Sequence, residues 1–176
     1  MSVIFLAGIH CVGKGYFGVP VAHGLGVSHF AASQLIREEK GQVTWGADKK
    51  TFDLDDNQLA LIRAVSHKRL THDNILLDGH FVLQNAQGKL IPLETEVFKE
   101  LRLTGVILLT EESHVIVSRL AMRDKSEMGL DAISELAEAE LAHATEVCRE
   151  LGLPLAVIRE PTEKSVTDAV KRLLKV

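Results

Sequence analysis

The sequence predicts an α/β protein, a three-layer sandwich in which helices cover both faces of a five-stranded parallel sheet. Five short aliphatic runs alternate with segments of helical periodicity, which is the pattern of repeated strand–helix–strand units. The runs are apolar along most of their length, as expected of strands that are covered on both faces. The runs are residues 3–7, 27–31, 74–80, 104–109 and 154–158.

Length and composition set the first limits on function. The 176 residues suit one domain, 1–176, with no metal or disulfide needed for its stability. A formal net charge of −4 gives no global basic field, so nucleic acid is an unlikely partner. There is no run of 18 apolar residues, and we expect no membrane span. Two cysteines and no signal-peptide pattern favour a reducing, cytoplasmic location.

A phosphate-binding loop follows the first aliphatic run. Gly8, Gly13 and Lys14 stand at the spacing G-x-x-x-x-G-K, which predicts a P-loop NTPase fold. The glycines let the backbone turn tightly and approach a ligand, and the inward N–H groups form an anion-binding nest. The helix that follows adds its positive end to the attraction for phosphate. The expected ATP-binding residues are Gly8, Ile9, His10, Cys11, Val12, Gly13, Lys14, Gly15 and Tyr16.

One position departs from the general loop pattern. The Ser or Thr that normally follows the lysine and helps to hold Mg²⁺ is replaced by Gly15, and Tyr16 comes next. The tyrosine hydroxyl lies too far from the backbone to replace a threonine. Phosphate binding is therefore better supported than Mg²⁺ binding by the loop itself.

The first helix is expected over residues 15–24. Phe17, Val21 and Val19 are its candidate inward residues, and Pro20 predicts a kink or an early break. After the second strand, Ser33 is a candidate N-cap for a helix that continues to Lys40.

Residues 41–53 contain few periodic apolar residues and read as a loop, with Trp45 inside it. Asp55 or Asp56 is a candidate cap for the next helix, which runs to about Leu70. The apolar stripe expected on this helix is Leu59, Ile62 and Val65, with Leu61 at its edge.

The second half of the chain shows four more helices. A polar turn at 85–89 precedes a helix expected from Pro92 to Leu101, and Thr110 is expected to cap the next helix. After a break at 124–129, a long helix spans 131–151, with Gly152 as its C-cap. The last helix is expected over 163–174, with Val166, Ala169, Val170 and Leu173 on its buried face.

Asp78 ends the third aliphatic run and is followed by glycine. Ligands of open α/β folds bind at the carboxyl ends of the strands, so Asp78 should lie beside the phosphate loop. Since burying a lone carboxylate costs several kcal/mol, we expect Asp78 to be hydrogen-bonded or linked to Mg²⁺.

Several stretches resemble the nucleoside monophosphate kinases, adenylate kinases in particular. The Gly-Lys-Gly of the loop is the variant found in adenylate kinases. Ser33–Arg37 is similar to their Gly-Asp-Leu-Leu-Arg, and Ile75–His80 resembles the strand end of the archaeal-type group. Arg119-Leu120-x-x-Arg123 is similar to the start of their lid, and only 124–130 stands where the long type has a lid domain.

The resemblance implies a role for each of these residues. Arg37, with Ser33 and His80, would bind the acceptor within a helical insertion at 32–73, and Arg119 and Arg123 would bind the transferring phosphate above a short lid loop at 124–130. Other interpretations stay open: Arg37 as a solvated helix residue, the other two arginines as partners of nearby acids, and His80 as a hydrogen-bond donor to a loop.

The sequence thus predicts an ATP-dependent phosphotransferase with Mg²⁺ as cofactor. Lys14, Arg119, Arg123 and Asp78 are the candidate catalytic residues, and Asp78 is also the candidate metal ligand. The expected ligands are a nucleoside triphosphate and a small phosphate or hydroxyl acceptor. Two alternatives remain: a nucleotide-binding NTPase or regulatory module that works through a partner, and a small-metabolite kinase on the same fold.

Overall fold

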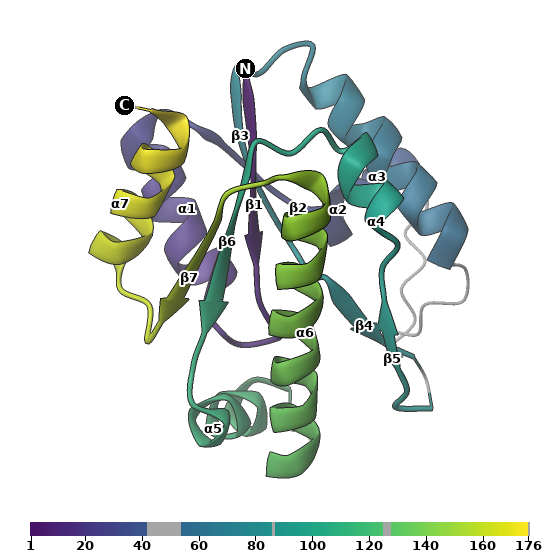
Figure 1. The fold of residues 1–176 in the computed structure, drawn as a ribbon, viewed down its shortest axis with the longest axis vertical. Coiled ribbons are helices and arrows are strands. Elements are labelled where there is room, and N and C mark those ends of the chain that lie inside the picture. Colours follow the sequence, from purple (N-terminus) through teal and green to yellow (C-terminus); the bar gives the residue numbers. More distant parts are fainter. Residues whose placement is uncertain (42–53, 86, 125–127, 176) are drawn as a thin grey trace.

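The computed structural model describes residues 1–41, 54–85, 87–124 and 128–175. Five parallel strands form one sheet in the order β2-β3-β1-β6-β7, with β1 in the centre (Figure 1). This confirms the predicted α/β class and the five-stranded parallel sheet. The strands are β1 (Ser2–Ala7), β2 (Ser28–Ala31), β3 (Asn74–Gly79), β6 (Gly105–Thr110) and β7 (Leu155–Arg159).

Helices cover both faces of the sheet (Figure 1). On one face α1 (Lys14–Leu25) packs against α7 (Glu163–Leu174), and on the other α6 (Leu130–Leu151) packs on β6. Beyond the β2 edge, α2 (Ala32–Glu39) packs against α3 (Leu54–Lys68). Helices α4 (Thr95–Glu100) and α5 (Ser113–Asp124) both pack against α6.

The core is densest around β1, where Val3 to Ala7 are all buried because β1 is the central strand and helices cover both faces of the sheet. An aromatic cluster joins β1 to the segment after β3 and to α4. The Phe5 ring lies 5.3 Å from the Phe81 ring and 5.7 Å from the Phe98 ring, and the Phe81 and Phe98 rings stack at 4.4 Å. Such pairs add to the stability that burial alone gives.

A two-stranded hairpin, β4 (Val82–Gln84) and β5 (Leu90–Pro92), stands where only a polar turn and the start of a helix were predicted. The Asn85 side chain accepts hydrogen bonds from the backbone N–H groups of Gln87 and Lys89, which closes the turn. Pro92 ends β5, and the helix begins only at Thr95. The prediction that Pro92 begins the helix was wrong because residues 90–92 pair with β4.

Pro20 does not break α1, which runs unbroken from Lys14 to Leu25. The predicted early break was wrong, and Pro20 lies at an exposed position of the helix. Val21 is buried as expected, but Val19 is 54% exposed. Val19 points outward because residues two positions apart lie on nearly opposite sides of an α-helix, and Val21 is the buried one.

Three further predictions at the helix ends and faces were wrong. The N-cap of α2 is Ala31, so Ser33 lies in the first turn. Asp55 and Asp56 likewise lie inside the first turn of α3. Thr110 is the last residue of β6 rather than a cap, and α5 begins at Ser113. Helix α2 begins directly after β2, and β6 extends past the end predicted for it before α5 begins.

The buried face of α3 also differs from the prediction. Leu59 is 53% exposed, and Leu61, expected at the edge of the stripe, is buried. The buried residues of this helix are Ala60, Leu61, Ala64 and Val65. The prediction followed the large apolar residues and overlooked Ala60 and Ala64, because small alanine side chains contribute little to a hydrophobic pattern.

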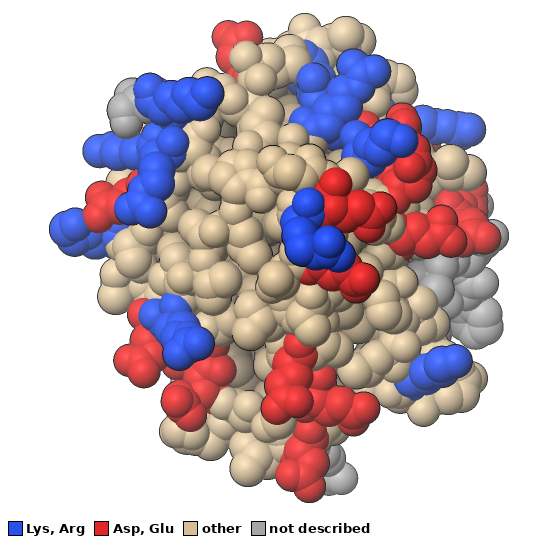
Figure 2. Space-filling view, viewed as in Figure 1, with Lys and Arg blue, Asp and Glu red and all other residues tan. Residues whose placement is uncertain are grey.

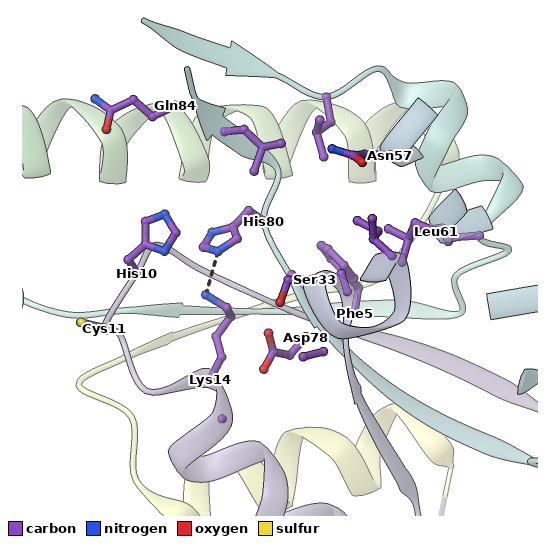
Figure 3. A pocket seen from close by; sticks show the side chains of 18 of the residues that line it. Phe5, His10, Cys11, Lys14, Ser33, Asn57, Leu61, Asp78, His80 and Gln84 are labelled. Atoms are coloured by element: carbon purple, nitrogen blue, oxygen red, sulfur yellow. Dashed lines mark hydrogen bonds between the residues drawn. The ribbon is translucent and has the colours of Figure 1, made fainter. Parts of the chain in front are cut away.

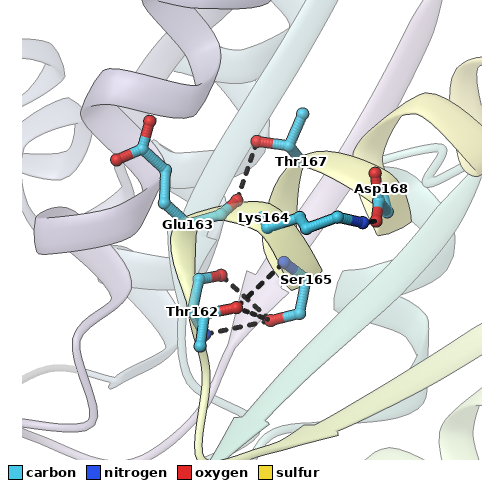
Figure 4. Close-up of polar contacts among 6 residues, drawn as sticks. All are labelled: Thr162, Glu163, Lys164, Ser165, Thr167 and Asp168. Carbon is cyan, nitrogen blue, oxygen red and sulfur yellow. Dashed lines mark hydrogen bonds and ion pairs between the residues drawn. The ribbon is translucent and has the colours of Figure 1, made fainter.

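The last two helices follow the prediction closely. Gly152 ends α6 in the left-handed conformation, with φ 64°. Val166, Ala169 and Val170 are buried on α7. A capping box starts α7, in which Thr162 N donates to Ser165 Oγ at 3.0 Å and Ser165 N donates to Thr162 Oγ1 at 3.1 Å (Figure 4).

On the face in Figure 2, Lys and Arg side chains gather mainly at the upper left and upper right, and Asp and Glu side chains lie beside them and along the lower part. None of the described helices has the length and apolar character that a membrane-spanning helix needs. Residues 42–53 of the predicted loop at 41–53, with Trp45, lie outside the described residues, as do residues 125–127 of the predicted lid loop at 124–130.

The capping box predicts the effect of removing its hydroxyl. The variant Thr162→Ala should lower the free energy of unfolding by about 1 kcal/mol, because the Ser165 N–H loses its acceptor. Thr167→Ala, in the interior of the same helix, is the matched control and should change it by less than about 0.5 kcal/mol. Urea denaturation measures both, and an equal effect of the two variants would show that the cap contributes nothing.

Candidate active site

The loop between β1 and α1 has the backbone geometry of an anion cradle. Gly8 and Gly13 adopt φ of 141° and 107°, and Cys11 adopts a left-handed φ of 60°. A Cβ at Gly8 would lie 2.6 Å from the Leu109 carbonyl oxygen, and one at Gly13 would lie 2.8 Å from the Phe17 ring. Side chains are therefore excluded at both glycines, and the loop presents backbone N–H groups at the start of α1.

Lys14 lies folded back across this loop. Its Nζ donates to the carbonyl oxygens of Gly8 at 2.7 Å and Ile9 at 3.2 Å, and lies 3.5 Å from His80 Nε2 (Figure 3). The side chain is 8% exposed. Burial lowers the pKa of Lys14 to about 8, although the negative charges of Asp78 and Glu140 oppose this shift. The ammonium group is thus held among acceptors that a phosphate would replace.

Asp78 lies beside the cradle, as predicted. In the sheet it pairs in register with Leu6 of β1 and Ala31 of β2, which places its carboxylate at the carboxyl ends of three strands. Asp78 Oδ2 lies 3.5 Å from His29 Nε2 and 4.0 Å from where a Cβ at Gly15 would stand. Figure 3 shows the carboxylate next to Lys14.

The side chains around Asp78 suit Mg²⁺ only when a nucleotide supplies further ligands. Mg²⁺ is usually bound through one or two carboxylates together with substrate phosphates and water. Within the described residues, no group of three or more His, Cys, Asp or Glu side chains forms a metal site. The residues therefore suit Mg²⁺ that arrives with a nucleotide, and they do not form a metal cage of their own.

Two histidine side chains, His10 and His80, lie next to each other near Lys14 (Figure 3). The rings of His10 and His80 lie 4.5 Å apart at a tilt of 49°. The pKa of His80 is well below its usual value because of burial first, and then because of the charges of Lys14 and His10. His80 is therefore neutral at pH 7, and its Nε2 faces the Lys14 ammonium as an acceptor.

Arg119 of α5 rests on the loop. One guanidinium nitrogen donates to the Cys11 carbonyl oxygen at 3.2 Å and the other to Glu111 Oε2 at 3.0 Å. Glu111 follows the end of β6, so the arginine is held between a strand end and the phosphate loop. Arg123 lies one turn further along α5, and both arginines line the cavity described next.

A cavity of about 1140 Å³ connects these groups. It runs from the loop to a second half that β1, α2, α3, β4 and α4 enclose; Figure 3 shows Asn57 and Leu61 beyond Asp78. The sequence-predicted residues that line it are His10, Cys11, Gly13, Lys14, Gly15, Tyr16, Ser33, Arg37, Asp78, His80, Arg119 and Arg123. Gly8, Ile9 and Val12 belong to the loop but do not line the cavity, and all three are buried.

Sequence reasoning missed Glu140. This α6 side chain is 1% exposed, and its carboxylate accepts hydrogen bonds from the backbone N–H groups that directly follow His80. A signal was present, because Glu140 stands four residues after Leu136 and four before Ala144, on the apolar stripe of a long helix. Asn57 and Gln58, which line the second half of the cavity, carried no comparable signal.

Comparisons with known proteins agree with this geometry. A sequence-family model described as an AAA domain matches residues 7–137. No curated protein matches the sequence significantly. Among solved structures, the chain is similar to the shikimate kinase of Bacteroides thetaiotaomicron, with TM-score 0.63, 14% identity and coverage of 99% of each chain.

Two further solved structures are similar in fold. The shikimate kinase of Acinetobacter baumannii, in complex with shikimate, has TM-score 0.62 and 16% identity, over 99% of this chain and 93% of that one. A gluconokinase of Sinorhizobium meliloti 1021 has TM-score 0.57 and 13% identity, over 99% and 91%. The chain thus has the fold of small P-loop kinases, whereas no adenylate kinase is among these three structures.

The buried ammonium group predicts how nucleotide binding depends on pH. Because the pKa of Lys14 is about 8 in the free protein and bound phosphate should raise it, ATP binding must take up a proton above pH 8. The affinity for Mg·ATP should therefore fall by up to about tenfold per pH unit above pH 8. Calorimetry in buffers of different ionisation enthalpy measures both effects, and Lys14→Ala should remove the proton uptake. An affinity that is flat from pH 7 to 10 would contradict this.

Proposed function

The chain belongs to the AAA domain family, and from this premise we propose that it is an ATP-dependent phosphotransferase with a small organic molecule as acceptor. One observation carries the proposal. A single cavity brings together the phosphate loop with Lys14, the carboxylate of Asp78, two arginines of α5 and a second half large enough for another ligand. Phosphoryl transfer needs positioning and charge neutralisation more than covalent chemistry, and these groups supply both.

The phosphate loop and Lys14 form the proposed donor site. The backbone N–H groups from Ile9 to Tyr16 would hold the β- and γ-phosphates of ATP. Lys14 would leave the carbonyl oxygens of Gly8 and Ile9 and donate to phosphate oxygens instead. This exchange replaces neutral acceptors with charged ones, which form stronger hydrogen bonds.

Asp78 is the residue proposed to hold Mg²⁺, directly or through its water molecules. The ion, when bound with ATP, neutralises phosphate charge. Asp78 is also placed to accept a proton from a hydroxyl acceptor in the second half of the cavity, because its carboxylate lies where the two halves meet.

The arginines of α5 are proposed to stabilise the charge that spreads over the transferring group. Arg119 is held by Cys11 and Glu111, so its guanidinium lies over the loop before ATP arrives. Arg123 projects from the same helix face one turn later. The loop at 124–130, proposed as a short lid, follows directly.

The second half of the cavity is the proposed acceptor site, and residues of α2 and α3, within the proposed insertion 32–73, line part of it. Among its described lining residues, Arg37 is the one Lys or Arg outside the phosphate loop and α5. Ser33, Asn57 and Gln58 add polar groups from α2 and α3, and His80 faces the acceptor from the end of β3. The solved structures with this fold include two shikimate kinases and a gluconokinase, so we place a small metabolite ahead of a nucleotide as acceptor.

A second candidate function is a nucleotide-binding module that hydrolyses ATP slowly and acts through a partner. The observation in its favour is the side chain that follows Gly15: Tyr16 is 80% exposed and offers no hydroxyl close to the loop. Tight binding of Mg·ATP without transfer to any acceptor would favour this candidate.

Removing the Lys14 ammonium group tests the donor site. Lys14→Ala should reduce phosphoryl transfer from radiolabelled ATP by about two to three orders of magnitude, because the positive charge that would neutralise the terminal phosphates is lost. The assay uses a panel of nucleotides, sugar acids and cyclic alcohols. Lys171→Ala, an exposed lysine of α7, is the control and should transfer at the wild-type rate. Undiminished transfer by the Lys14 variant would end the proposal.

The role of Asp78 separates hydroxyl acceptors from phosphate acceptors. If the acceptor is a hydroxyl, Asp78→Asn should lower kcat by about 10²–10⁴-fold, and raised Mg²⁺ should not restore it. Asp73→Asn, at an exposed position before β3, is the matched control. Recovery of the Asn variant at high Mg²⁺ would assign Asp78 to the metal alone and point to an acceptor that needs no base.

A further inference from the structure

The carboxylate of Glu140 is the one buried acid in the described part of the chain. Only Lys14 and Glu140 are buried among the polar and charged side chains there. Burial raises the pKa of Glu140, and its hydrogen bonds with backbone N–H groups and the charge of Lys14 oppose this rise. A buried acid is costly unless it has partners, so its contacts indicate what it does.

Its hydrogen-bond partners are in the segment that leaves β3. Phe81 N donates to both carboxylate oxygens at 3.0 Å, and Val82 N donates to Oε2 at 2.7 Å. These two residues follow His80 directly and lie three and four residues after Asp78. The carboxylate of an α6 residue therefore fixes the backbone that carries two groups of the candidate active site.

A second contact from α6 strengthens this hold. One turn after Glu140, His143 Nε2 donates to the Leu93 carbonyl oxygen at 2.6 Å, and Leu93 N donates to the Phe81 carbonyl oxygen at 2.9 Å. The helix thus holds both ends of the β4–β5 hairpin. Leu83, Gln84 and Leu93 of this region line the acceptor half of the cavity.

We propose that Glu140 is a positioning residue for phosphoryl transfer. Its carboxylate holds the exit of β3, so that Asp78 and His80 face the phosphate loop, and it holds the base of the hairpin that forms one wall of the acceptor site. Its negative charge also interacts with the positive charge of Lys14. A neutral side chain in its place could accept from the two N–H groups but would not offset this charge. This role rests on the proposed phosphotransferase function.

The test compares Glu140→Gln with Glu138→Gln, an exposed acid on the same helix. Glu140→Gln keeps the shape of the side chain but directs an amide N–H₂ at a backbone donor and removes the charge. We expect kcat to fall at least tenfold and the acceptor KM to rise, while the Kd for a non-hydrolysable ATP analogue with Mg²⁺ changes less than threefold. Glu138→Gln should match the wild type in all three.

Amide exchange provides a readout that does not need activity. In Glu140→Gln, the N–H groups of Phe81 and Val82 should exchange at least tenfold faster than in the wild type, while those of α7 should not change. If wild-type protein transfers phosphate to no acceptor, the proposed function fails, and this exchange result still decides whether Glu140 holds the β3 exit.

Two results would overturn the proposal. One is wild-type kcat and acceptor KM in folded Glu140→Gln, and the other is unchanged exchange at residues 81 and 82. If Glu140→Gln does not fold, Glu140→Asp decides, since it keeps the charge but shortens the reach by one methylene. A fall in kcat is expected there as well, and a wild-type kcat would contradict the positioning role.

Discussion

The buried ammonium group of Lys14 is the constraint around which the site is arranged. A charge at 8% exposure needs acceptors, and the loop supplies them from its own carbonyl groups, those of Gly8 and Ile9. Two carboxylates, Asp78 and Glu140, keep the charged form from becoming too costly. The same surroundings leave the ammonium group weakly solvated, so a phosphate that enters the loop competes with fixed carbonyl groups and meets little water. The affinity of the loop for anions is thus built in before a ligand arrives.

This arrangement depends on close packing of backbone against backbone. Gly8 approaches the Leu109 carbonyl so closely that a Cβ would lie 2.6 Å from its oxygen, and Gly79 lies against the Phe5 ring, where a Cβ would lie 2.7 Å away. These contacts hold the ends of β1, β3 and β6 together. The loop and Glu111 directly follow β1 and β6, and Asp78 is the last residue but one of β3. The central place of β1 in the sheet order therefore brings the loop between an acid and an arginine that lie far apart in sequence.

The sequence was enough to predict the features that rest on a pattern of several apolar residues or on a motif. The five strands are aliphatic runs, the phosphate loop is a spacing of three residues, and α7 carries an apolar stripe. The parts that it did not predict depend on contacts between distant segments. Leu59 and Leu61 exchange roles because α2 and α4 pack on α3, and residues 90–92 form a strand because β4 pairs with them. The role of Glu140 likewise requires α6 to lie over the end of β3, which no local pattern reveals.

Two long side chains at the phosphate-loop end of the cavity are held in place by hydrogen bonds within the protein. In the donor half, Lys14 is hydrogen-bonded to the loop and Arg119 is bound to Cys11 and Glu111, so the cost of ordering these long side chains is met on folding. In the proposed acceptor half, Arg37 lies on α2, a helix that packs mainly on α3. Helix α5 links to α6 through the Ser134–Ser113 hydrogen bond at 2.9 Å, and α6 links to the acceptor wall through Glu140. For the proposed phosphotransferase, charges that are already held in the donor half favour the transition state, since they need no reorganisation at the moment of reaction.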